Sequence, residues 1–246
     1  MFSMNPRIQS VKALLNRLGV ENNYVFEAIV TTCSVDGTPN AAPMGIRFVS
    51  GGTGDDEKKV LIKPFNSTTT YRNLSTEREA VINISSDLAI FYESAFKRQV
   101  RHDIKSKIAF NPSKTVKPPR LKGCDAYLEV SVESVTDDIS EENNRSQILC
   151  HVKSIHLQNP RAKLYCRAPY VLFEAIVHAT RVNQLRSQGL ADQADELMRL
   201  IERYCKLIQR LAPSSRYEEI AKELVKMTLR GKDATRPQGE EKEEMA

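Results

Sequence analysis

Residues 24–49 read YVFEAIVTTCSVDGTPNAAPMGIRFV, and this stretch decides the fold. Its first ten residues are rich in β-branched and aromatic side chains, which predicts a strand. Asp36 and Gly37 favour a tight hairpin turn, so residues 38–49 are expected to return as an antiparallel strand. Pro43 has no amide hydrogen for a strand ladder and Gly45 has no side chain to pack. Together they predict a bulge, or a place where a ligand comes close to the backbone.

Strand-like segments continue after this hairpin. A helix is expected before it, where apolar residues recur at helical spacing up to Gly19. Another helix is expected from the N-cap residue Asp87 to Phe96, and a short one follows a turn between residues 66 and 77. Six strands joined mostly by hairpin-length turns predict a small antiparallel barrel in a protein that is mainly β with α. The four further strands are expected at residues 59–65, 80–84, 126–135 and 148–157.

After residue 168 the pattern changes to helix. Amphipathic segments are expected at 170–188 and 197–211, and a third begins at the capping pair Ser215 and Glu218 and ends at Gly231. The residues beyond have no apolar periodicity and are typical of a disordered tail. The expected organisation is a barrel domain with an N-terminal helix at 1–168, a helical subdomain at 169–231 and a tail at 232–246.

The composition is that of an ordinary globular protein, with 41% apolar and 27% charged residues in a chain of 246. No apolar run approaches the roughly 18 residues that a membrane span needs, and the first residues lack the apolar stretch of a signal peptide. Five widely spaced cysteines, an odd number, favour a reducing compartment. We therefore expect a cytoplasmic protein without a membrane partner.

The net charge of +5 is concentrated in one segment. Nine of the 36 basic residues, but only one of the 31 acidic residues, lie between Lys97 and Lys122. Three interpretations of residues 97–122 are open: a solvated surface loop, a surface that steers an anionic substrate or phosphorylated cofactor, and a nucleic-acid interface. The third is the weakest, because Phe110 is the only aromatic residue among these charges.

Two segments at the ends of expected strands contain more small and hydroxylated residues than a core needs. Residues 66–73, NSTTTYRN, place four consecutive hydroxyl groups at an expected helix start, with Arg72 close by. Free amides at a helix N-terminus, hydroxyl donors and a guanidinium form a phosphate pocket, although N-capping and turn formation explain the same hydroxyl groups. Residues 39–47, PNAAPMGIR, offer backbone donors and acceptors beside small side chains, which a flat heteroaromatic ring needs.

The segments TTCSVDGTPNAAPMGIR, KPFNSTTTYRNL, AVINIS and RAPYVLFEAIVHATR resemble, in this order, domain-of-unknown-function family 447. The resemblance runs from about residue 24 to residue 186. It implies an FMN-binding split barrel, which is a six-stranded antiparallel Greek-key barrel, and a homodimer with FMN at the interface. It also implies the cofactor-binding residues: Thr68, Thr69, Thr70 and Arg72 at the flavin phosphate, Asn40, Ala42, Pro43, Met44, Gly45, Ile46 and Arg47 along the isoalloxazine ring, and Lys63, Phe65, Asn73 and Asn83 as neighbours.

The expected function is therefore that of an FMN-binding flavoprotein, a flavin-dependent oxidoreductase acting on a small anionic substrate. Hydride transfer to a flavin requires no acid–base pair, and the sequence contains no catalytic dyad. The alternative is a non-catalytic flavin carrier that recruits a partner through its helical part. The family has no settled reaction, so the substrate, the electron donor and the catalytic residues stay open. No metal is expected, because the spacing of Cys150, His151, His156 and Cys166 matches no zinc pattern.

Overall fold

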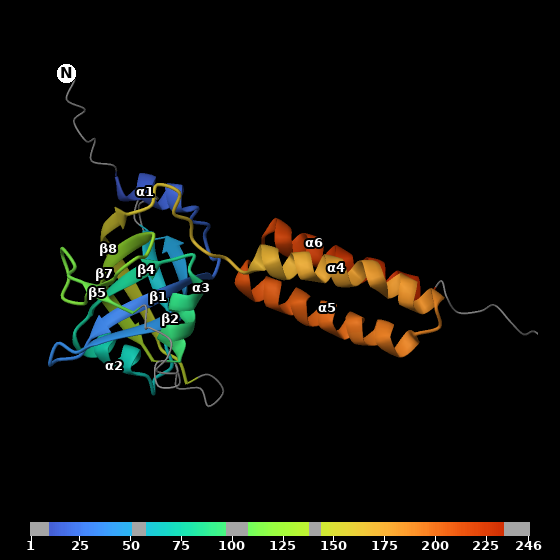
Figure 1. Cartoon of the computed structure of the whole chain (residues 1–246), viewed down its shortest axis with the longest axis horizontal. Coiled ribbons are helices and arrows are strands. Elements are labelled where there is room, and N and C mark those ends of the chain that lie inside the picture. Colours follow the sequence, from blue (N-terminus) through green and yellow to red (C-terminus); the bar gives the residue numbers. More distant parts are fainter. Residues whose placement is uncertain (1–9, 51–57, 97–107, 138–143, 234–246) are drawn as a thin grey trace, which may run out of the picture. The chain divides into compact units, whose positions relative to one another are not determined.

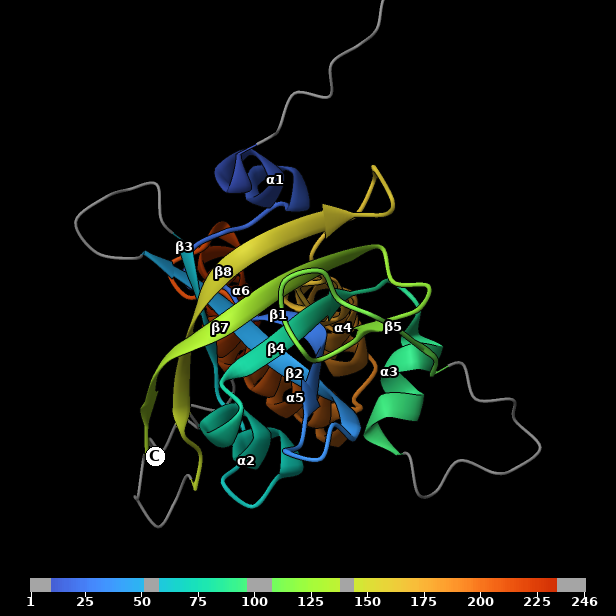
Figure 2. The same ribbon diagram turned by 90° about the vertical axis from the view of Figure 1, so that its left-hand side faces the viewer.

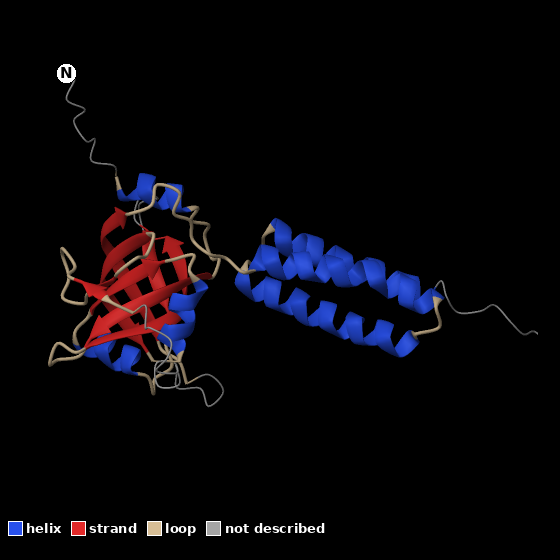
Figure 3. Ribbon diagram, viewed as in Figure 1, coloured by secondary structure: helices blue, strands red, loops and turns tan. Residues whose placement is uncertain are grey.

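The computed structural model describes residues 10–50, 58–96, 108–137 and 144–233 (Figure 1). The chain divides into two compact units, residues 1–166 and residues 167–246. All the strands belong to the first unit, and the described part of the second unit is helical (Figure 3).

The first unit is a closed barrel of six antiparallel strands, as expected. Around the barrel the strands follow the order β1, β2, β3, β8, β7 and β4, and β4 pairs with β1 to close it. Helix α2 lies at one end of the barrel and α1 at the other (Figure 1, Figure 2). The six strands are β1 (Phe26–Cys33), β2 (Pro39–Ser50), β3 (Lys58–Ile62), β4 (Glu79–Ile84), β7 (Ala126–Thr136) and β8 (Gln147–Leu157); the helices are α1 (Val11–Leu18), α2 (Thr69–Thr76) and α3 (Leu88–Ala95); and β5 (Phe110–Asn111) pairs with β6 (Arg120–Leu121) outside the barrel.

Successive side chains of each strand point alternately into and out of the barrel. The inward residues form the main core, with Val30, Ile46 and Phe48 among its fully buried members. The outward face of β1, β4 and β7 is buried as well, because α3 and the segment that contains β5 and β6 cover it. A second apolar cluster there includes Ile29 and Val81. The polar residues on this outer face must therefore find partners inside the protein.

The local signals in the sequence for turns and helix ends are confirmed. Gly37 in the hairpin turn and Gly19 after α1 adopt positive φ angles of 82° and 76°, which glycine tolerates without steric cost. Asp87 caps α3 by accepting a hydrogen bond from the amide of Ala89 at 2.9 Å. These signals depend on a few neighbouring residues, so they can be predicted without knowledge of the fold.

The bulge expected at Pro43 and Gly45 is wrong. Pro43 pairs with Ile29 and Gly45 pairs with Glu27 in an unbroken register. Pairing of β2 with β3 begins only at Ile46, and within the described ranges no strand pairs with residues 39–45 on that side. Proline is tolerated at such an edge. We call residues 39–45 the free edge of β2, meaning that no strand in the described ranges pairs with them on the side away from β1. The register shifts lie instead between β7 and β8, where Glu133 of β7 and Lys153 of β8 are the extra residues.

The end of the third strand also differs from expectation. Strand β3 ends at Ile62, and Phe65 forms an isolated bridge with Arg145 instead of extending the strand. Residues 51–57, between β2 and β3, lie outside the described residues, as do residues 97–107.

The second unit contains three helices in its described part. Its core includes Val182 from the first helix and Met198 and Ile201 from the second. The third helix runs through Gly231 to Asp233, two residues past its expected end, and the expected tail after it lies outside the described residues. No helix in the described ranges is long and apolar enough to cross a membrane. The helices are α4 (Ala168–Ser187), α5 (Ala191–Leu211) and α6 (Arg216–Asp233).

Candidate functional site

The free edge of β2 meets the N-terminal part of α2. The side-chain amide of Asn40 donates to Thr70 Oγ1 at 3.1 Å, and the side-chain amide of Asn73 donates to Thr32 Oγ1 at 3.1 Å. Asn73 and Thr70 are buried, so these hydrogen bonds are well shielded from water. They join α2 to β1 and β2 and hold the first turn of the helix beside the start of the free edge.

The first turn of α2 forms an anion cradle, by which we mean Thr68, Thr69, Thr70 and Arg72. Thr68 is the N-cap: its hydroxyl oxygen accepts from the amide of Tyr71 at 3.2 Å and donates to the carbonyl of Phe65 at 2.7 Å. The amides of Thr69 and Thr70 begin the helix and have no acceptor within it. The exposed Arg72 lies beside Thr69, with 3.5 Å between Nη2 and Oγ1. The first turn contains no acidic residue, so its positive end is not neutralised locally.

A second guanidinium lies next to this cradle, and sequence reasoning missed it. Arg145 stacks on the half-exposed ring of Phe65, with its Cζ atom 3.8 Å from the ring centroid. The amide of Asn66 donates to the carbonyl of Asn144, and the amide of Ser146 donates to the carbonyl of Pro64, so the two segments run side by side. No local pattern marks Arg145, because only this long-range pairing brings it to α2.

Most side chains along the free edge are small, and all but that of the buried Ala41 are at least partly exposed. Ala42, Pro43 and Met44 are half-buried, and Gly45 is exposed. A Cβ atom at Gly45 would lie only 2.9 Å from Cγ1 of Val25, so the glycine makes room for a neighbouring side chain. On the side away from β1, the backbone groups of the free edge form no ladder with a described strand.

The structure does not bring every expected site residue to this surface. Ile46 is fully buried in the barrel core, and Asn83 is fully buried on the outer face of β4. Asn83 donates to the carbonyl of Ile29 and accepts from the amide of Leu121, each at 2.8 Å, so its side chain is engaged within the protein. The expected residues that remain half-buried or exposed are Asn40, Ala42, Pro43, Met44, Gly45, Arg47, Lys63, Phe65, Thr68, Thr69 and Arg72.

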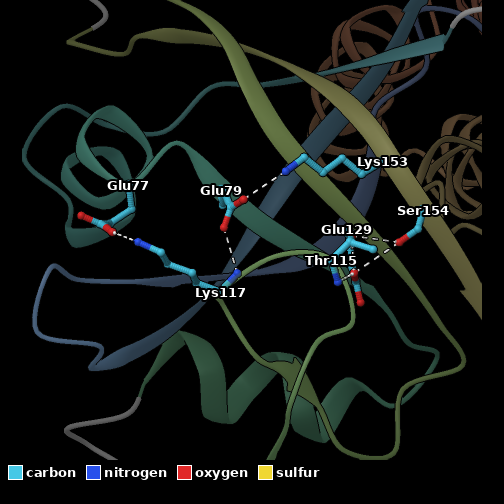
Figure 4. Close-up of polar contacts among 7 residues, drawn as sticks. All are labelled: Glu77, Glu79, Thr115, Lys117, Glu129, Lys153 and Ser154. Atoms are coloured by element: carbon cyan, nitrogen blue, oxygen red, sulfur yellow. Dashed lines mark hydrogen bonds and ion pairs between the residues drawn. The ribbon is translucent and has the colours of Figure 1, made fainter.

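Part of the basic segment is firmly attached to the barrel. We call residues 108–122 the strap. The amide of Lys114 donates to the carboxylate of the fully buried Glu129 at 2.9 Å. The amide of Thr115 donates to the same carboxylate at 2.6 Å, and the amide of Lys117 donates to Glu79 at 2.8 Å (Figure 4). The strap is therefore not a solvated, loosely held loop.

The cysteines in the barrel are not poised for nucleophilic chemistry. Burial, with a smaller effect from Glu77, raises the pKa of Cys33 above its ordinary value. Burial also raises the pKa of Cys150 to about 12. Cys150 faces the core, whereas its neighbour His151 is exposed on the other side of β8, so the pair cannot act on one ligand.

The sequence of the barrel identifies the protein family. The chain is a member of the family of proteins of unknown function DUF447, because the model of that family's N-terminal domain matches residues 26–159. The match extends from the first residue of β1 to just beyond β8, so it spans the whole barrel. No curated protein matches the chain.

Solved structures with related folds include flavin proteins. An FMN-bound DUF447 protein from Methanosarcina mazei is 20% identical, with a TM-score of 0.46, and the match covers 87% of this chain and 99% of that one. Component B of nitrilotriacetate monooxygenase from Bacillus cereus is 19% identical, with a TM-score of 0.45 and coverage of 64% and 81%. Flavoredoxin of Desulfovibrio vulgaris is 12% identical, with a TM-score of 0.44 and coverage of 64% and 76%.

Proposed function

We propose that this chain is an FMN-binding flavoprotein. The observation that carries the proposal is the meeting of the free edge of β2 with the anion cradle of α2. One surface then offers backbone groups for a flat ring and positive groups for a phosphate, and FMN contains both. Membership of DUF447 adds support, because the Methanosarcina mazei protein of this family is described as FMN-bound.

The residues present fit a flavin phosphate. The amides of Thr69 and Thr70, the hydroxyl of Thr69 and the guanidinium of Arg72 would hold it, and Arg145 would add a second cation. All of these groups donate hydrogen bonds, and two guanidinium groups match the geometry of phosphate oxygens. In this proposal, backbone groups of residues 39–45 orient the ring, and the small side chains there let it approach.

We also propose that the protein is an oxidoreductase for a small anionic substrate. FMN supplies reversible hydride and electron transfer when it is bound. The chain contributes orientation and electrostatics: the exposed Lys63, Arg72 and Arg145 attract anions to the same surface. Backbone amides of the free edge stabilise negative charge on a group placed against them.

A second candidate function is that of a flavin carrier. Tyr170, Phe173 and Ile176 form an apolar stripe on α4, with 59%, 65% and 39% of their surfaces exposed. Exposed apolar patches of this kind are typical of interaction sites, which favours partner recruitment by the helical unit. The two candidates differ in whether an electron donor reduces the bound FMN. Reduction of bound FMN by NADH, NADPH or a reduced deazaflavin supports the oxidoreductase, and failure of all three donors favours the carrier.

We further propose a homodimer with FMN at the interface, in a reducing compartment. Thr69 and Arg72 of the cradle are exposed on one chain, and a second copy packed against them would exclude water from the flavin. The reducing compartment is supported by the five cysteines, which all lie in the described ranges and form no disulfide there. Light scattering with and without FMN tests the dimer, and a monomer in both conditions would contradict it.

The phosphate assignment is tested by comparing FMN with riboflavin, which lacks the phosphate. We expect R72A and R145A each to weaken FMN binding by roughly tenfold, the usual effect of losing one charged hydrogen bond, and to leave riboflavin binding unchanged. R199A, which removes an exposed arginine of α5, is the matched control. An equal loss of both ligands would argue against the phosphate site. Purified protein that is colourless and takes up no FMN would remove both candidate functions.

A further inference from the structure

A cavity of about 400 Å³ opens on the outside of the barrel, at the end opposite the anion cradle. It lies where β7 begins, and there Ala126 pairs with Ile84 at the end of β4 and with Leu157 at the end of β8. Helix α2 instead packs where β1 ends, through the Thr32–Asn73 hydrogen bond. Because β1 and β4 are antiparallel, these two sites lie at opposite ends of β4. The cavity is therefore separate from the proposed flavin site.

The cation of this cavity is Arg120 of the strap. Its Nε atom donates to the carbonyl of Pro112 at 3.1 Å, and its Cζ atom lies 5.1 Å from the ring centroid of Tyr127. Within the described residues, its two terminal nitrogens make no hydrogen bond. The guanidinium is thus held in place while its terminal donors stay available, which is the arrangement that binds a carboxylate through two parallel hydrogen bonds.

The opposing charge in the cavity is Asp125. Its Oδ1 atom accepts from the side-chain amide of Asn159 at 3.0 Å, and its Oδ2 atom accepts from the amide and the hydroxyl of Ser86 at 3.1 and 3.2 Å. These hydrogen bonds fix the carboxylate and offset part of its charge. Oδ2 already accepts two hydrogen bonds, but Oδ1 accepts only one and has a second lone pair, so Asp125 can accept a further hydrogen bond from a ligand through Oδ1.

The remaining titratable groups of the cavity are neutral near pH 7. Burial, with a smaller contribution from Asp125, raises the pKa of Cys124 to about 12. Burial also raises the pKa of Tyr127, and the nearby Arg120 only partly opposes this effect. The cavity therefore contains one positive and one negative charge, together with the side-chain amides of Asn111 and Asn159. This balance accommodates a ligand with a single negative charge better than a dianion.

We propose that this cavity binds a small carboxylic acid that also carries a hydroxyl or ammonium group on the neighbouring carbon. The carboxylate binds the terminal nitrogens of Arg120, and the donor group faces Asp125 and the side-chain amide oxygens. A cavity of this volume is within the range of ligand sites in proteins. The shared chemistry is a carboxylate next to a hydrogen-bond donor, so an α-hydroxy acid and an α-amino acid are the two ligand types to compare.

The test is a titration of the full-length protein at pH 7, followed by ligand-observed NMR and calorimetry. The probes are L-lactate and L-serine, with acetate, ethanolamine and inorganic phosphate as comparisons. We expect saturable binding of lactate or serine. Acetate, which lacks the neighbouring donor, should bind roughly tenfold more weakly, and ethanolamine, which lacks the carboxylate, should not bind. Whichever of lactate and serine binds more tightly identifies the ligand type.

Variants show whether the binding uses this cavity. R120Q removes the cation, and N111D adds a second negative charge at an exposed position, so each should weaken the tighter probe by tenfold or more. K122Q removes a neighbouring exposed cation that does not line the cavity, and it should bind as the unmodified protein does. Circular dichroism and thermal unfolding show that each variant is folded. N111D leaves Arg120 in place, so it keeps the test decisive if R120Q unfolds.

Three results would overturn the proposal: no saturable binding of lactate or serine at millimolar concentrations, tighter binding of phosphate than of either carboxylate, or unchanged binding in both R120Q and N111D. The titration is repeated with R72A, which targets the flavin cradle. Carboxylate binding should be the same in this variant. Failure of the flavin proposal and failure of this proposal can therefore be told apart.

Discussion

Asn83 shows how one buried polar side chain joins two layers of the protein. It lies on the outer face of β4, and its amide group donates to the carbonyl of Ile29 on the neighbouring strand. Its carbonyl oxygen accepts from the amide of Leu121 in the strap. Both Asn83 and Leu121 are buried, so water cannot replace either partner. The side chain therefore acts as a connector between barrel and strap.

We expect N83A to destabilise the first unit by about 1–3 kcal/mol, because it leaves the buried amide of Leu121 without its acceptor. The free energy of unfolding is measured in urea by circular dichroism. The matched control is N16A, which changes an exposed asparagine of α1 and should have little effect. If N83A and N16A are equally stable, the connector role is wrong.

The strap is held mainly by two carboxylates. Burial alone would raise the pKa of Glu129, but hydrogen bonds from Thr115 and Lys114 outweigh burial and hold the pKa below its ordinary value. Glu79 behaves in the same way: burial opposes the shift, and the amide of Lys117 and the ammonium of Lys153 lower the pKa. Burial also lowers the pKa of His156, which lies 3.7 Å from Glu129. In the unfolded chain all three groups bind protons more readily.

Because the unfolded state binds more protons at these sites, stability falls as the pH falls. The contribution of His156 should begin to weaken below its ordinary pKa of 6.5, and that of the carboxylates below their ordinary pKa of 4.5. We expect E129Q to reduce stability at pH 7 and to flatten the pH dependence below 4.5. The measurement is the free energy of unfolding in urea from pH 3.5 to pH 7.

The control for this prediction is E133Q on the same strand. Glu133 is 43% exposed and pairs with Lys59 at the surface, where an ion pair contributes little. E133Q should keep the pH dependence of the unmodified protein. An E129Q variant with the same pH profile as E133Q would show that Glu129 does not clamp the strap.

At the scale of the whole molecule, the chain consists of two compact units, and the boundary between them in the sequence lies between Cys166 and Arg167. The barrel unit has its own core, and α4, α5 and α6 have another that includes Val182 and Met198. A separate core is the main requirement for folding alone. We infer that each unit folds independently.

We therefore expect a fragment of residues 1–166 to unfold cooperatively and to bind FMN as the full chain does. The decisive measurement does not depend on flavin: N83A should lower the free energy of unfolding by the same amount in the fragment and in the full chain. A fragment that is unfolded, or insensitive to N83A, would show that the barrel needs the helical unit.

Sequence alone predicted the features that depend on short-range geometry. The turn at Gly37, the cap at Asp87 and the capping pair of α6, in which the amide of Glu218 donates to Ser215 Oγ, were all readable from neighbouring residues. The β-branched and aromatic side chains of residues 24–33 predicted the first strand, and the barrel contains the six strands that were expected. The bulge at Pro43 was wrong, since a bulge is a property of two paired strands and not of one.

The sequence by itself therefore determined the strands, helices and caps, and with them a barrel whose α2 begins in a row of hydroxyl groups. Only the tertiary structure decided which residues of that barrel are accessible. It buried Asn83 and Ile46, brought Arg145 to Phe65, and left residues 39–45 without a described strand on the side away from β1. The physical reason is that secondary structure follows from contacts between close neighbours in the chain, whereas accessibility depends on pairing between segments far apart in it.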